Sequence, residues 1–462
     1  MNRDDQVSQI RETLVDGLGR RGFLRAAAAV GALGAARAAG VAIATTPAAA
    51  DTAAAAELPK EALQPGTGPI YGQHYLPSSP DQVRWGYVPS LTSEPVLRMR
   101  SGETVTVDTV SHEGILEDQG RDPLRYFAGH GVPASKVLTD AVAIARDYQR
   151  TTRNFDVDGP HVVTGPIYVE GAQRGDVLKI EMLSMLPRVG YGVVSSRHGK
   201  GALPRLSGGA VPAGITLGEI MPPAATDGRA TGDPARYGNV SVFTPVRRGK
   251  GGTPTGVLPR GTTGEVVFPL KPFMGLIGVA FAASDTLAAP ALNSIPPTLG
   301  GGNIDISQLG VGATLYLPVF AEGALFHVGD PHMAMGDGEV ALTAMEGSLR
   351  GTFRLTVCKA GSSDAPSVAF RYPFAETEQA WIPVGLSDPD GAQNGQINDL
   401  NIAMRRAVVN ALDFLEHDQG MDRAVAYAYL SAAADFTVTQ VVDRTVGVHG
   451  LLQKAHFTDG GH

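Results

Sequence analysis

Acid and histidine side chains are most concentrated between residues 329 and 339, where the sequence reads GDPHMAMGDGE. In an extended chain, residues two positions apart point to the same face and lie roughly 6.5–7 Å apart. Asp330 would then share a face with His332, and Asp337 with Glu339. Mixed imidazole and carboxylate ligands suit zinc or another divalent ion, and an open coordination position would activate water. Because Asp-Gly pairs are also common in hairpins, an ordinary turn is the alternative.

A second group of side chains able to do acid–base chemistry follows a predicted strand at residues 103–107. Asp108 could bind a metal ion or hold a histidine, while His112 and Glu113 could transfer protons. The ends of strands, where loops begin, are common positions for binding and catalytic groups. A surface turn with no role in chemistry is the alternative for this segment.

Asp305 follows a run of three glycines, residues 300–302. Such a run costs backbone entropy and offers no side chain to pack, so it indicates a backbone that closely approaches something else. A ligand or metal near Asp305 would explain it, and so would a tight turn packed on a neighbouring strand. His161, which follows a Gly-Pro pair, could hydrogen-bond a substrate or could be a structural histidine.

The composition predicts a large, strand-rich protein. The chain has 462 residues, 43% of them hydrophobic, and its 58 glycines and 32 prolines favour many short strands joined by turns. A formal net charge of −8 argues against a nucleic-acid partner, which would call for clustered Lys and Arg. The lone cysteine, Cys358, excludes a disulfide within the chain and a cysteine-based zinc site. Its strand-like surroundings predict a small core residue rather than a reactive thiol.

The first fifty residues are typical of an export signal. Arg20 and Arg21 precede Gly-Phe-Leu, an Ala-rich apolar stretch follows, and residues 48–50 are all alanine. This order predicts a twin-arginine signal, residues 1–50, with the mature chain beginning near Asp51. Arg37 interrupts the apolar stretch, which is too short to span a bilayer. We therefore expect a periplasmic or extracellular protein with no stable membrane anchor.

The elements that position these residues are expected to be mainly strands. Residues 51–80 are rich in Ala, Pro and Gly and are expected to form a linker. Residues 81–372 are predicted to form a β-rich catalytic core, with long Gly- and Pro-rich loops between about 195 and 263. Residues 373–462 are expected to add an α/β segment that completes the core. The predicted fold class is α+β and β-rich, with sandwich-like or barrel-like sheets and a C-terminal helical segment.

Hydrophobic periodicity gives the positions of individual elements. Strands are predicted at residues 95–99, 103–107, 166–169, 176–181, 265–268, 276–280, 314–320, 353–358 and 437–442. Apolar residues at helical spacing predict helices at 399–417 and 422–434, the first behind a cap at Asn398 or Asp399.

Several of these segments resemble, in order, the acetamidase/formamidase family. The matching stretches read HVVTGPIYVEGA (161–172), NSIPP (293–297), GGNID (301–305), LYLPV (315–319), GDPH (329–332) and GDGE (336–339). The C-terminal stretches SAAADF (431–436) and TQVVD (439–443) are similar to the closing segment of that family. The resemblance therefore extends from about residue 80 to residue 455.

The resemblance implies hydrolysis of the C–N bond of formamide, acetamide or a related small amide, with release of ammonia. It also implies a β-rich α+β scaffold that usually forms homo-oligomers and sometimes binds a metal ion. The site residues that it carries over are Asp108, His161, Asp305, Asp330, His332 and Glu339, together with His112 and Glu113 in a turn that differs among family members.

Our hypothesis gives this set three roles around a divalent cation, zinc or alternatively calcium, with no organic cofactor. The proposed metal ligands are Asp108, Asp305, Asp330 and His332. A carboxylate would deprotonate water and a histidine would orient the substrate carbonyl. The candidates for these two roles are Glu339 or Glu113 as the base, and His161 or His112 as the orienting group.

Two other functions remain open at the level of sequence. Gly361-Ser362-Ser363 superficially resembles the loop of serine amidases, but Asp364 stands where that class has glycine, and its lysine and serine spacing is missing. An exported, non-catalytic β-rich protein that binds a small ligand is the alternative from another class. An aromatic content of only 6% favours the enzyme, because such a binding groove is often lined with aromatic residues.

Overall fold

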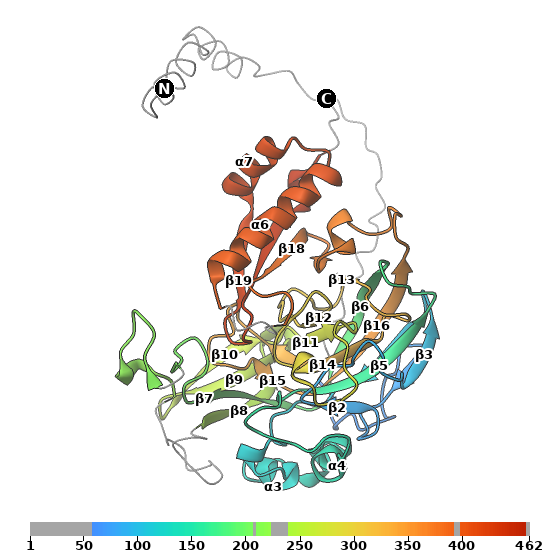
Figure 1. The fold of residues 1–462 in the computed structure, drawn as a ribbon. Helices are drawn as coiled ribbons and strands as arrows, with labels where there is room; N and C mark the ends of the chain where they lie inside the picture. Colours follow the sequence, from blue (N-terminus) through green and yellow to red (C-terminus); the bar gives the residue numbers. More distant parts are fainter. Residues whose placement is uncertain (1–57, 207–208, 223–238, 392–397, 459–462) are drawn as a thin grey trace, which may run out of the picture. The chain divides into compact units, whose positions relative to one another are not determined.

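Strands dominate the structure, a computed structural model that describes residues 58–206, 209–222, 239–391 and 398–458. The predicted export signal, residues 1–50, lies outside the described residues. Among the residues described, no helix is both long and apolar enough to cross a membrane. The described residues belong to one unit, which Figure 1 shows as sheets with a helical segment at one end.

The first sheet brings together strands from the whole length of the described chain. Its central pair is antiparallel, with Phe353 opposite Met182 and Leu355 opposite Ile180. The order of strands is β1 (His74–Leu76), β4 (Thr104–Asp108), β16 (Leu349–Cys358), β6 (Val177–Pro187), β13 (Thr314–Pro318), β17 (Phe374–Glu376), β18 (Ala380–Leu386), β20 (Gly447–Gln453) and β19 (Asp435–Gln440).

The second sheet carries most of the chemistry-bearing segments. Its order is β10 (Gly264–Pro269), β9 (Pro254–Arg260), β8 (Asn239–Arg248), β7 (Tyr191–Arg197), β15 (Met345–Glu346), β14 (Phe326–Ala334), β11 (Phe273–Gly278) and β12 (Gly301–Asn303). Off this path, β5 (Val162–Glu170) pairs with β14, β2 (Val83–Trp85) and β3 (Leu97–Arg100). A register shift between His332 and Ala334 interrupts the pairing of β14 with β15.

The two sheets share an apolar core. Phe326 of β14 and Phe353 of β16 meet edge to face with ring centroids 5.6 Å apart, and neither side chain is exposed. Contacts of this kind between the faces of two sheets are those of a β-sandwich. Cys358 is buried at the end of β16, which confirms it as a core residue.

Four helices border the sheets among the described residues. α3 (Pro123–Ala128) and α4 (Thr139–Asp147) lie at one end of the unit, and α6 (Leu400–His417) and α7 (Arg423–Ala433) lie near β18 and β19 (Figure 1). Asp399 caps α6 by accepting a hydrogen bond from the Asn401 amide at 2.8 Å. Gly385 lets α6 lie directly on β18, since a Cβ at that position would stand 2.1 Å from the Ala403 carbonyl oxygen.

The predicted fold class, β-rich α+β with a C-terminal helical segment, is confirmed. Both predicted C-terminal helices are present within one residue of their expected ends. Three features differ from expectation. From residue 58 the expected linker packs on the core, because β1 pairs in parallel with β4. The expected long loops between 195 and 263 contain β8 and β9, and the short helices α3 and α4 were not predicted from the sequence.

Candidate active site

Buried histidine and carboxylate side chains from distant parts of the chain converge beside β14. Each of these side chains is at most 6% exposed. Half of them follow the end of a strand, where the backbone is free to turn the side chain toward the common centre. The group consists of His112 after β4, His161 before β5, Asp305 after β12, Asp330 and His332 in β14, Glu339 in the following turn, Glu346 in β15 and Asp443 after β19.

Asp330 and His332 lie side by side, as the period of a strand predicts. His332 Nε2 lies 3.0 Å from Asp330 Oδ2 and 3.2 Å from Glu346 Oε1. The expected pairing of Asp337 with Glu339 is wrong. Glu339 has a φ of 44°, so the chain turns there, and the exposed Asp337 instead accepts a hydrogen bond from Ser307.

Asp330 also faces two histidines. Its Oδ1 lies 3.5 Å from His112 Nδ1, and its Oδ2 lies 3.6 Å from His161 Nε2. The two imidazole rings meet edge to face with centroids 5.5 Å apart. His161 Nδ1 lies 3.1 Å from the Ser294 carbonyl oxygen, which can only accept, so we assign the proton to Nδ1. The lone pair of Nε2 then points toward Asp330, as a metal ligand requires.

Asp305, His332 and Glu339 form a second group on the other side of His332. Their ligand atoms lie within 4.8 Å of one another, as do those of two further groups, His112–His161–Asp330 and Asp330–His332–Glu346. Three of the carboxylate residues sit in the left-handed backbone region, with φ of 50° at Asp305 and 49° at Asp330 in addition to Glu339. Non-glycine residues adopt this conformation at a cost of about 1–3 kcal/mol, and such strain gathers at functional sites.

Many buried polar atoms of the group have no hydrogen-bond partner. Both carboxylate oxygens of Asp305, both ring nitrogens of His112, Oδ1 of Asp330 and Nδ1 of His332 are in this state. A buried, unpaired carboxylate is strongly unfavourable, and a bound cation would offset that cost. Imidazole nitrogens and carboxylate oxygens together are the donors that zinc and related divalent ions accept. The residues present therefore fit a divalent cation.

The crowding of acids shifts their protonation equilibria in different directions. Burial, reinforced by Asp305, raises the pKa of Glu339 well above its usual range. Burial and Asp443 do the same to Asp305. Burial opposes ionisation of Asp330 too, but His161 and His332 outweigh it and lower its pKa. Asp330 is thus the most firmly charged carboxylate at the centre of the group.

Burial lowers the pKa of His161 to about 4, and the neighbouring His112 and His332 add to this effect against the opposing charge of Asp330. A neutral imidazole is the form that binds a metal ion or accepts a proton. His161 is therefore available in that form at neutral pH.

Glu113 is held in place by a network of its own. It accepts hydrogen bonds from Gln119 and from Ser195 Oγ, the latter at 2.7 Å, and lies 3.5 Å from Arg197. Burial raises its pKa, but Arg197 and His112 outweigh burial and lower the pKa to about 2. A carboxylate with such a low pKa is a weak base, so Glu339, whose pKa is raised, is better suited than Glu113 to accept a proton.

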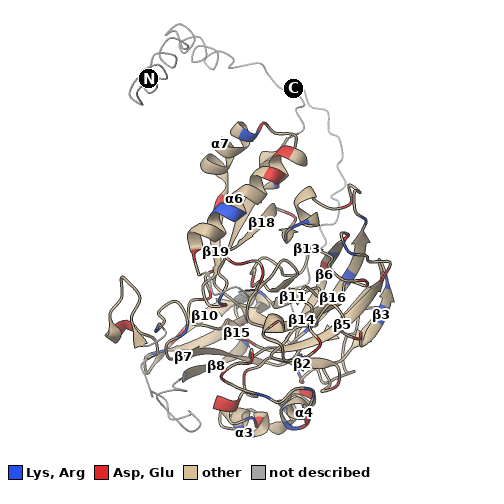
Figure 2. Cartoon of the chain, in the orientation of Figure 1, with Lys and Arg blue, Asp and Glu red and all other residues tan. Residues whose placement is uncertain are grey.

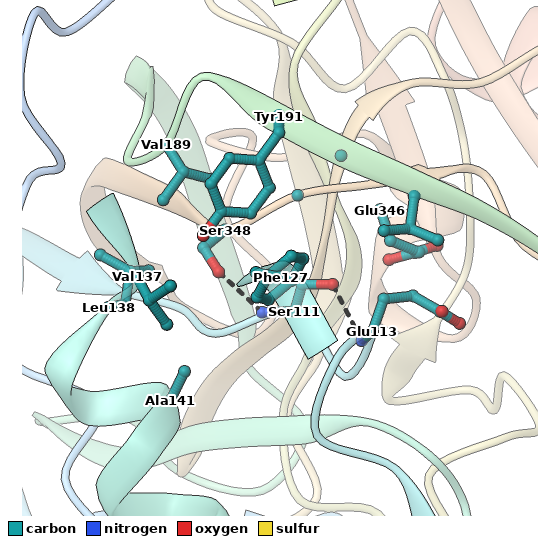
Figure 3. Close-up of a pocket in the computed structure, with 13 residues that line it drawn as sticks. Ser111, Glu113, Phe127, Val137, Leu138, Ala141, Val189, Tyr191, Glu346 and Ser348 are labelled. Atoms are coloured by element: carbon teal, nitrogen blue, oxygen red, sulfur yellow. Dashed lines mark hydrogen bonds between the residues drawn. The ribbon is translucent and has the colours of Figure 1, made fainter. Parts of the chain in front are cut away.

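The turn that carries His112 and Glu113 is anchored behind the site. Figure 3 shows the Ser111 amide donating to Ser348 Oγ and the Glu113 amide donating to Ser111 Oγ, at 3.0 and 3.2 Å. The cavity drawn there holds about 20 Å³, room for roughly one water molecule. Its walls are largely apolar, with Phe127 and Tyr191 beside Glu113, so they keep this side of the site at low dielectric.

Asp108 lies outside the converging group, contrary to the role expected for it. Its carboxylate is bound by Arg350, with Nε at 2.6 Å, by Arg188 at 3.4 Å and by the Tyr75 hydroxyl at 2.7 Å. No candidate metal group among the described residues contains Asp108. Two buried guanidinium groups already balance the charge of Asp108. In this structure Asp108 therefore acts as an ion-pair partner within the scaffold.

Sequence reasoning missed Glu346, Asp443 and Gly275. Glu346 lies in a strand of only two residues, in a stretch that carries no recognisable motif. Asp443 belongs to a matching stretch at the C-terminus, and that was the one available signal for it. Gly275 in β11 leaves the space in which Asp305, His332 and Asp330 meet, since a Cβ there would stand 2.4–2.8 Å from atoms of all three.

Replacing Gly275 by alanine is therefore expected to disrupt the site. The added methyl group must displace Asp305 and His332, and we expect amide hydrolysis to fall on the order of 10²-fold, because misplacing catalytic groups by about 1 Å has this effect. Gly190→Ala is the matched control, because a Cβ there has open space around it. Equal activity of the Gly275 and Gly190 variants in a steady-state ammonia assay would contradict this arrangement.

Six residues of the converging group, all except Asp305 and His332, line a cavity of about 390 Å³ and form its floor. This volume lies within the roughly 300–1,000 Å³ of small-molecule sites. The apolar side chains Leu116, Phe155 and Ile295 line it together with His112 and Asp330. A small substrate could therefore reach the buried polar groups from this cavity.

Comparisons with known proteins point to one family. Residues 262–451, which include Asp305, Asp330, His332 and Glu339, match the Acetamidase/Formamidase family. The chain is 26% identical over 315 residues to an acetamidase of Mycolicibacterium smegmatis, covering 61% of this chain and 75% of that one. It is 30% identical over 140 residues to a formamidase of Methylophilus methylotrophus, covering 29% of this chain and 34% of that one.

Solved structures share the fold. A crystal structure of acetamidase from Yersinia enterocolitica superposes with a TM-score of 0.57 at 22% identity, covering 87% of this chain and 97% of that one. An acetamidase from Bacillus halodurans superposes with a TM-score of 0.55 at 23% identity, covering 83% and 98%. The match over residues 262–451 and the curated relatives confirm that this chain resembles the acetamidase/formamidase family.

Proposed function

We propose that this protein hydrolyses the C–N bond of short linear amides and releases ammonia. The observation that carries the proposal is the set of buried, unpaired histidine and carboxylate atoms around Asp330 at the floor of a small-molecule cavity. In the overall reaction water adds its oxygen to the carbonyl carbon, the C–N bond breaks, and a proton goes to the departing nitrogen. The relatives named acetamidase and formamidase support this reaction.

The ligands of a divalent cation would be drawn from the residues whose ligand atoms converge in three overlapping groups: His112, His161, Asp305, Asp330, His332, Glu339 and Glu346. We propose zinc as the ion, with calcium as the alternative, since a site of nitrogen and oxygen donors favours zinc and an all-oxygen site favours calcium. When bound, such an ion would polarise the amide carbonyl and lower the pKa of water.

The protein side chains have distinct tasks in this proposal. Glu339 accepts the proton of the attacking water, because burial and Asp305 favour its protonated form. Because His161 carries its proton on Nδ1, its Nε2 lone pair suits a metal ligand, and the task of orienting the carbonyl falls to His112. Arg197 fixes Glu113, and Glu113 in turn lies 3.5 Å from His112 Nε2 and positions that ring. The apolar side chains of the cavity exclude bulk water.

The rival functions receive less support. Ser362 lies in a surface turn, where its hydroxyl accepts a hydrogen bond from the Asp364 amide. No histidine is recorded as its partner among the described residues, so it lacks the activating base that a serine nucleophile needs. A passive binding protein would not need unpaired, strained carboxylates at the floor of its cavity. The enzyme is therefore the better explanation.

We also propose that the protein is exported and acts outside the cytoplasm as a homo-oligomer. The export proposal rests on the twin-arginine pattern at residues 20–21 and the alanines that follow it. Removal of residues 1–50 during secretion, detected by N-terminal sequencing of the protein from culture fluid or periplasm, would support it. Light scattering on the purified chain would give the oligomeric state.

The proposed reaction is tested by measuring ammonia release from formamide, acetamide, propionamide and urea with the purified protein. We expect release from at least one of the three amides. Release from none of them by a folded protein would overturn the proposed function.

Removing bound metal is expected to abolish the activity and weaken the fold. Dialysis against a chelator and then against metal-free buffer should lower ammonia release by at least ~10²-fold, since the cation supplies most of the carbonyl polarisation. The melting temperature should fall as well, because a ligand present at a free concentration of 100 times its Kd stabilises the folded state by about 2.7 kcal/mol. Elemental analysis checks the metal content. An unchanged melting curve in protein shown to have lost its metal would contradict this prediction.

A further inference from the structure

The cavity above the site gathers cationic side chains. Arg153, Arg197, Lys200 and Arg444 all line it. Over helices α4 and α6, by contrast, acidic and basic residues are interspersed (Figure 2). A local group of like charges attracts small ligands of the opposite sign. Six acids line the same cavity and must be set against these cations: Asp156, Asp158, Asp330, Glu339, Glu346 and Asp443.

Two of the four cations have protein partners. Arg153 lies 3.2 Å from Glu117 and 3.4 Å from Asp158, so its charge is satisfied by these acids. Arg197 lies 2.8 Å from Asp118, in addition to its contact with Glu113. These arginines and their acids neutralise one another, and they hold the wall of the cavity in place.

Lys200 and Arg444 have no ion pair or hydrogen bond to any acid that the structure describes. Lys200 is an exposed residue at the cavity mouth, yet protein surrounds its ammonium group closely enough to affect titration. Burial, followed by the nearby Arg197 and Arg444, lowers the pKa of Lys200 to about 8. Lys200 and Arg444 therefore lie close enough to repel each other, and Asp118 and Asp443 act on them only from a distance, so a bound anion would relieve the repulsion.

Arg444 is held in an unusual conformation. Its φ of 64° lies in the left-handed region, which costs a non-glycine residue of order 1 kcal/mol or more. The half-buried side chain lines the cavity, and it makes no hydrogen bond among the described residues that would compensate. Strain that places an unpaired guanidinium beside Asp443, at the edge of the site, points to a ligand contact.

We propose that the substrate is an amide that carries a carboxylate at its far end, and that Lys200 and Arg444 bind this carboxylate. The inference rests on the proposed function and adds the class of substrate. Monoamides of short dicarboxylic acids have this chemistry. The volume of about 390 Å³ leaves room for a molecule larger than formamide or acetamide.

The charges of the cavity also orient such a substrate. Its floor contains Asp330, Glu339 and Glu346, and these carboxylates repel a second anion. The carboxylate end is therefore directed outward to Lys200 and Arg444, and the neutral amide end is directed inward. An alternative role for the two cations is to offset the negative charge of the floor, and this role would be independent of the substrate.

The test compares succinamate with butyramide, two amides of the same chain length of which only the first carries a carboxylate. The kcat/KM for ammonia release is measured for both at low and high salt with the full chain. We expect a ratio in favour of succinamate of at least ~10 at low salt that falls as salt screens the contact. In Lys200→Gln and in Arg444→Gln the ratio should fall about tenfold. Arg125→Gln, an exposed cation on α3, should leave it as in the wild type.

Two results would overturn the inference. Butyramide could be hydrolysed with a kcat/KM equal to or above that of succinamate, or the variants could lower both constants by the same factor. The second result would assign Lys200 and Arg444 to charge compensation. If neither these nor the shorter amides are hydrolysed, the proposed function fails. Calorimetric titration with succinamate then decides the inference separately, since binding that is lost in both variants would support it and absence of binding would overturn it.

Discussion

Replacing Asp330 by asparagine is expected to lower kcat/KM for amide hydrolysis on the order of 10³-fold, which is ~4 kcal/mol of transition-state stabilisation. Asp330 is the only carboxylate recorded in two of the candidate metal groups of the described residues, with His112 and His161 in one and His332 in the other. Asparagine keeps the shape of the side chain but removes the charge that binds a cation. Steady-state ammonia release and metal content by elemental analysis should both fall.

Asp337→Asn is the matched control for this substitution. Asp337 belongs to the same acid-rich stretch of the sequence, residues 329–339, yet it is exposed and its partner is Ser307. Its variant should remain within about twofold of the wild type, as expected for a surface substitution. If Asp330→Asn kept wild-type activity and metal content, the site would have to be placed elsewhere.

Replacing Asp108 by asparagine is expected to have the largest effect on stability. Asp108, Arg350 and Arg188 are all at most 1% exposed, and the amide of asparagine cannot balance two guanidinium charges. Breaking a buried ion pair from one side costs about 3–5 kcal/mol, because the other charge is left unpaired. Urea unfolding followed by fluorescence or circular dichroism measures this loss.

Two comparisons separate the scaffold role of Asp108 from that of a metal ligand. Asp147→Asn removes an exposed partner of Arg146, at 2.7 Å, and should leave the midpoint of urea unfolding unchanged, because solvent screens this pair. Metal content per folded molecule of Asp108→Asn should equal that of the wild type. A variant that unfolds like the wild type but binds no metal would show that Asp108 is a ligand after all.

The sequence predicts those parts of the site that depend on local geometry. Asp330 and His332 could be paired because a strand places residues two apart on one face, and β14 is such a strand. The same rule failed for Asp337 and Glu339, because β14 ends at Ala334 and these two residues lie in the turn that follows it. Asp and Gly are compatible with both conformations, so local sequence does not decide between them.

The other parts of the site depend on pairing between strands that are far apart in the sequence. Asp108 looks like a site residue from its type and its place at the end of a strand. Its actual partner Arg350 is 242 positions away and becomes its neighbour only when β16 pairs with β4. Glu346 reaches the site in a similar way, through the pairing of β15 with β14 opposite His332. No local sequence pattern predicts such contacts, since they arise from the order of strands in a sheet.

The sequence predicts the fold class, but it predicts only some of the individual helices and strands. Helix α6 was found because apolar residues at helical spacing follow a cap at Asp399. The strands β8 and β9 were missed because glycine and proline around them suggest loops, although sheet pairing with β7 and β10 stabilises them. Tertiary contacts override local propensity most readily in such short, Gly-rich segments.

Whether amide hydrolysis depends on a bound divalent cation is tested by adding the cation back to chelator-treated protein and following ammonia release. For the wild type, activity should return in proportion to bound zinc and level off at a fixed number of ions per chain. His332→Ala, which removes a ligand shared by two of the candidate groups, should recover little at the same total zinc. Full activity in the wild-type protein before any cation is added, with no metal detected by elemental analysis, would contradict the account.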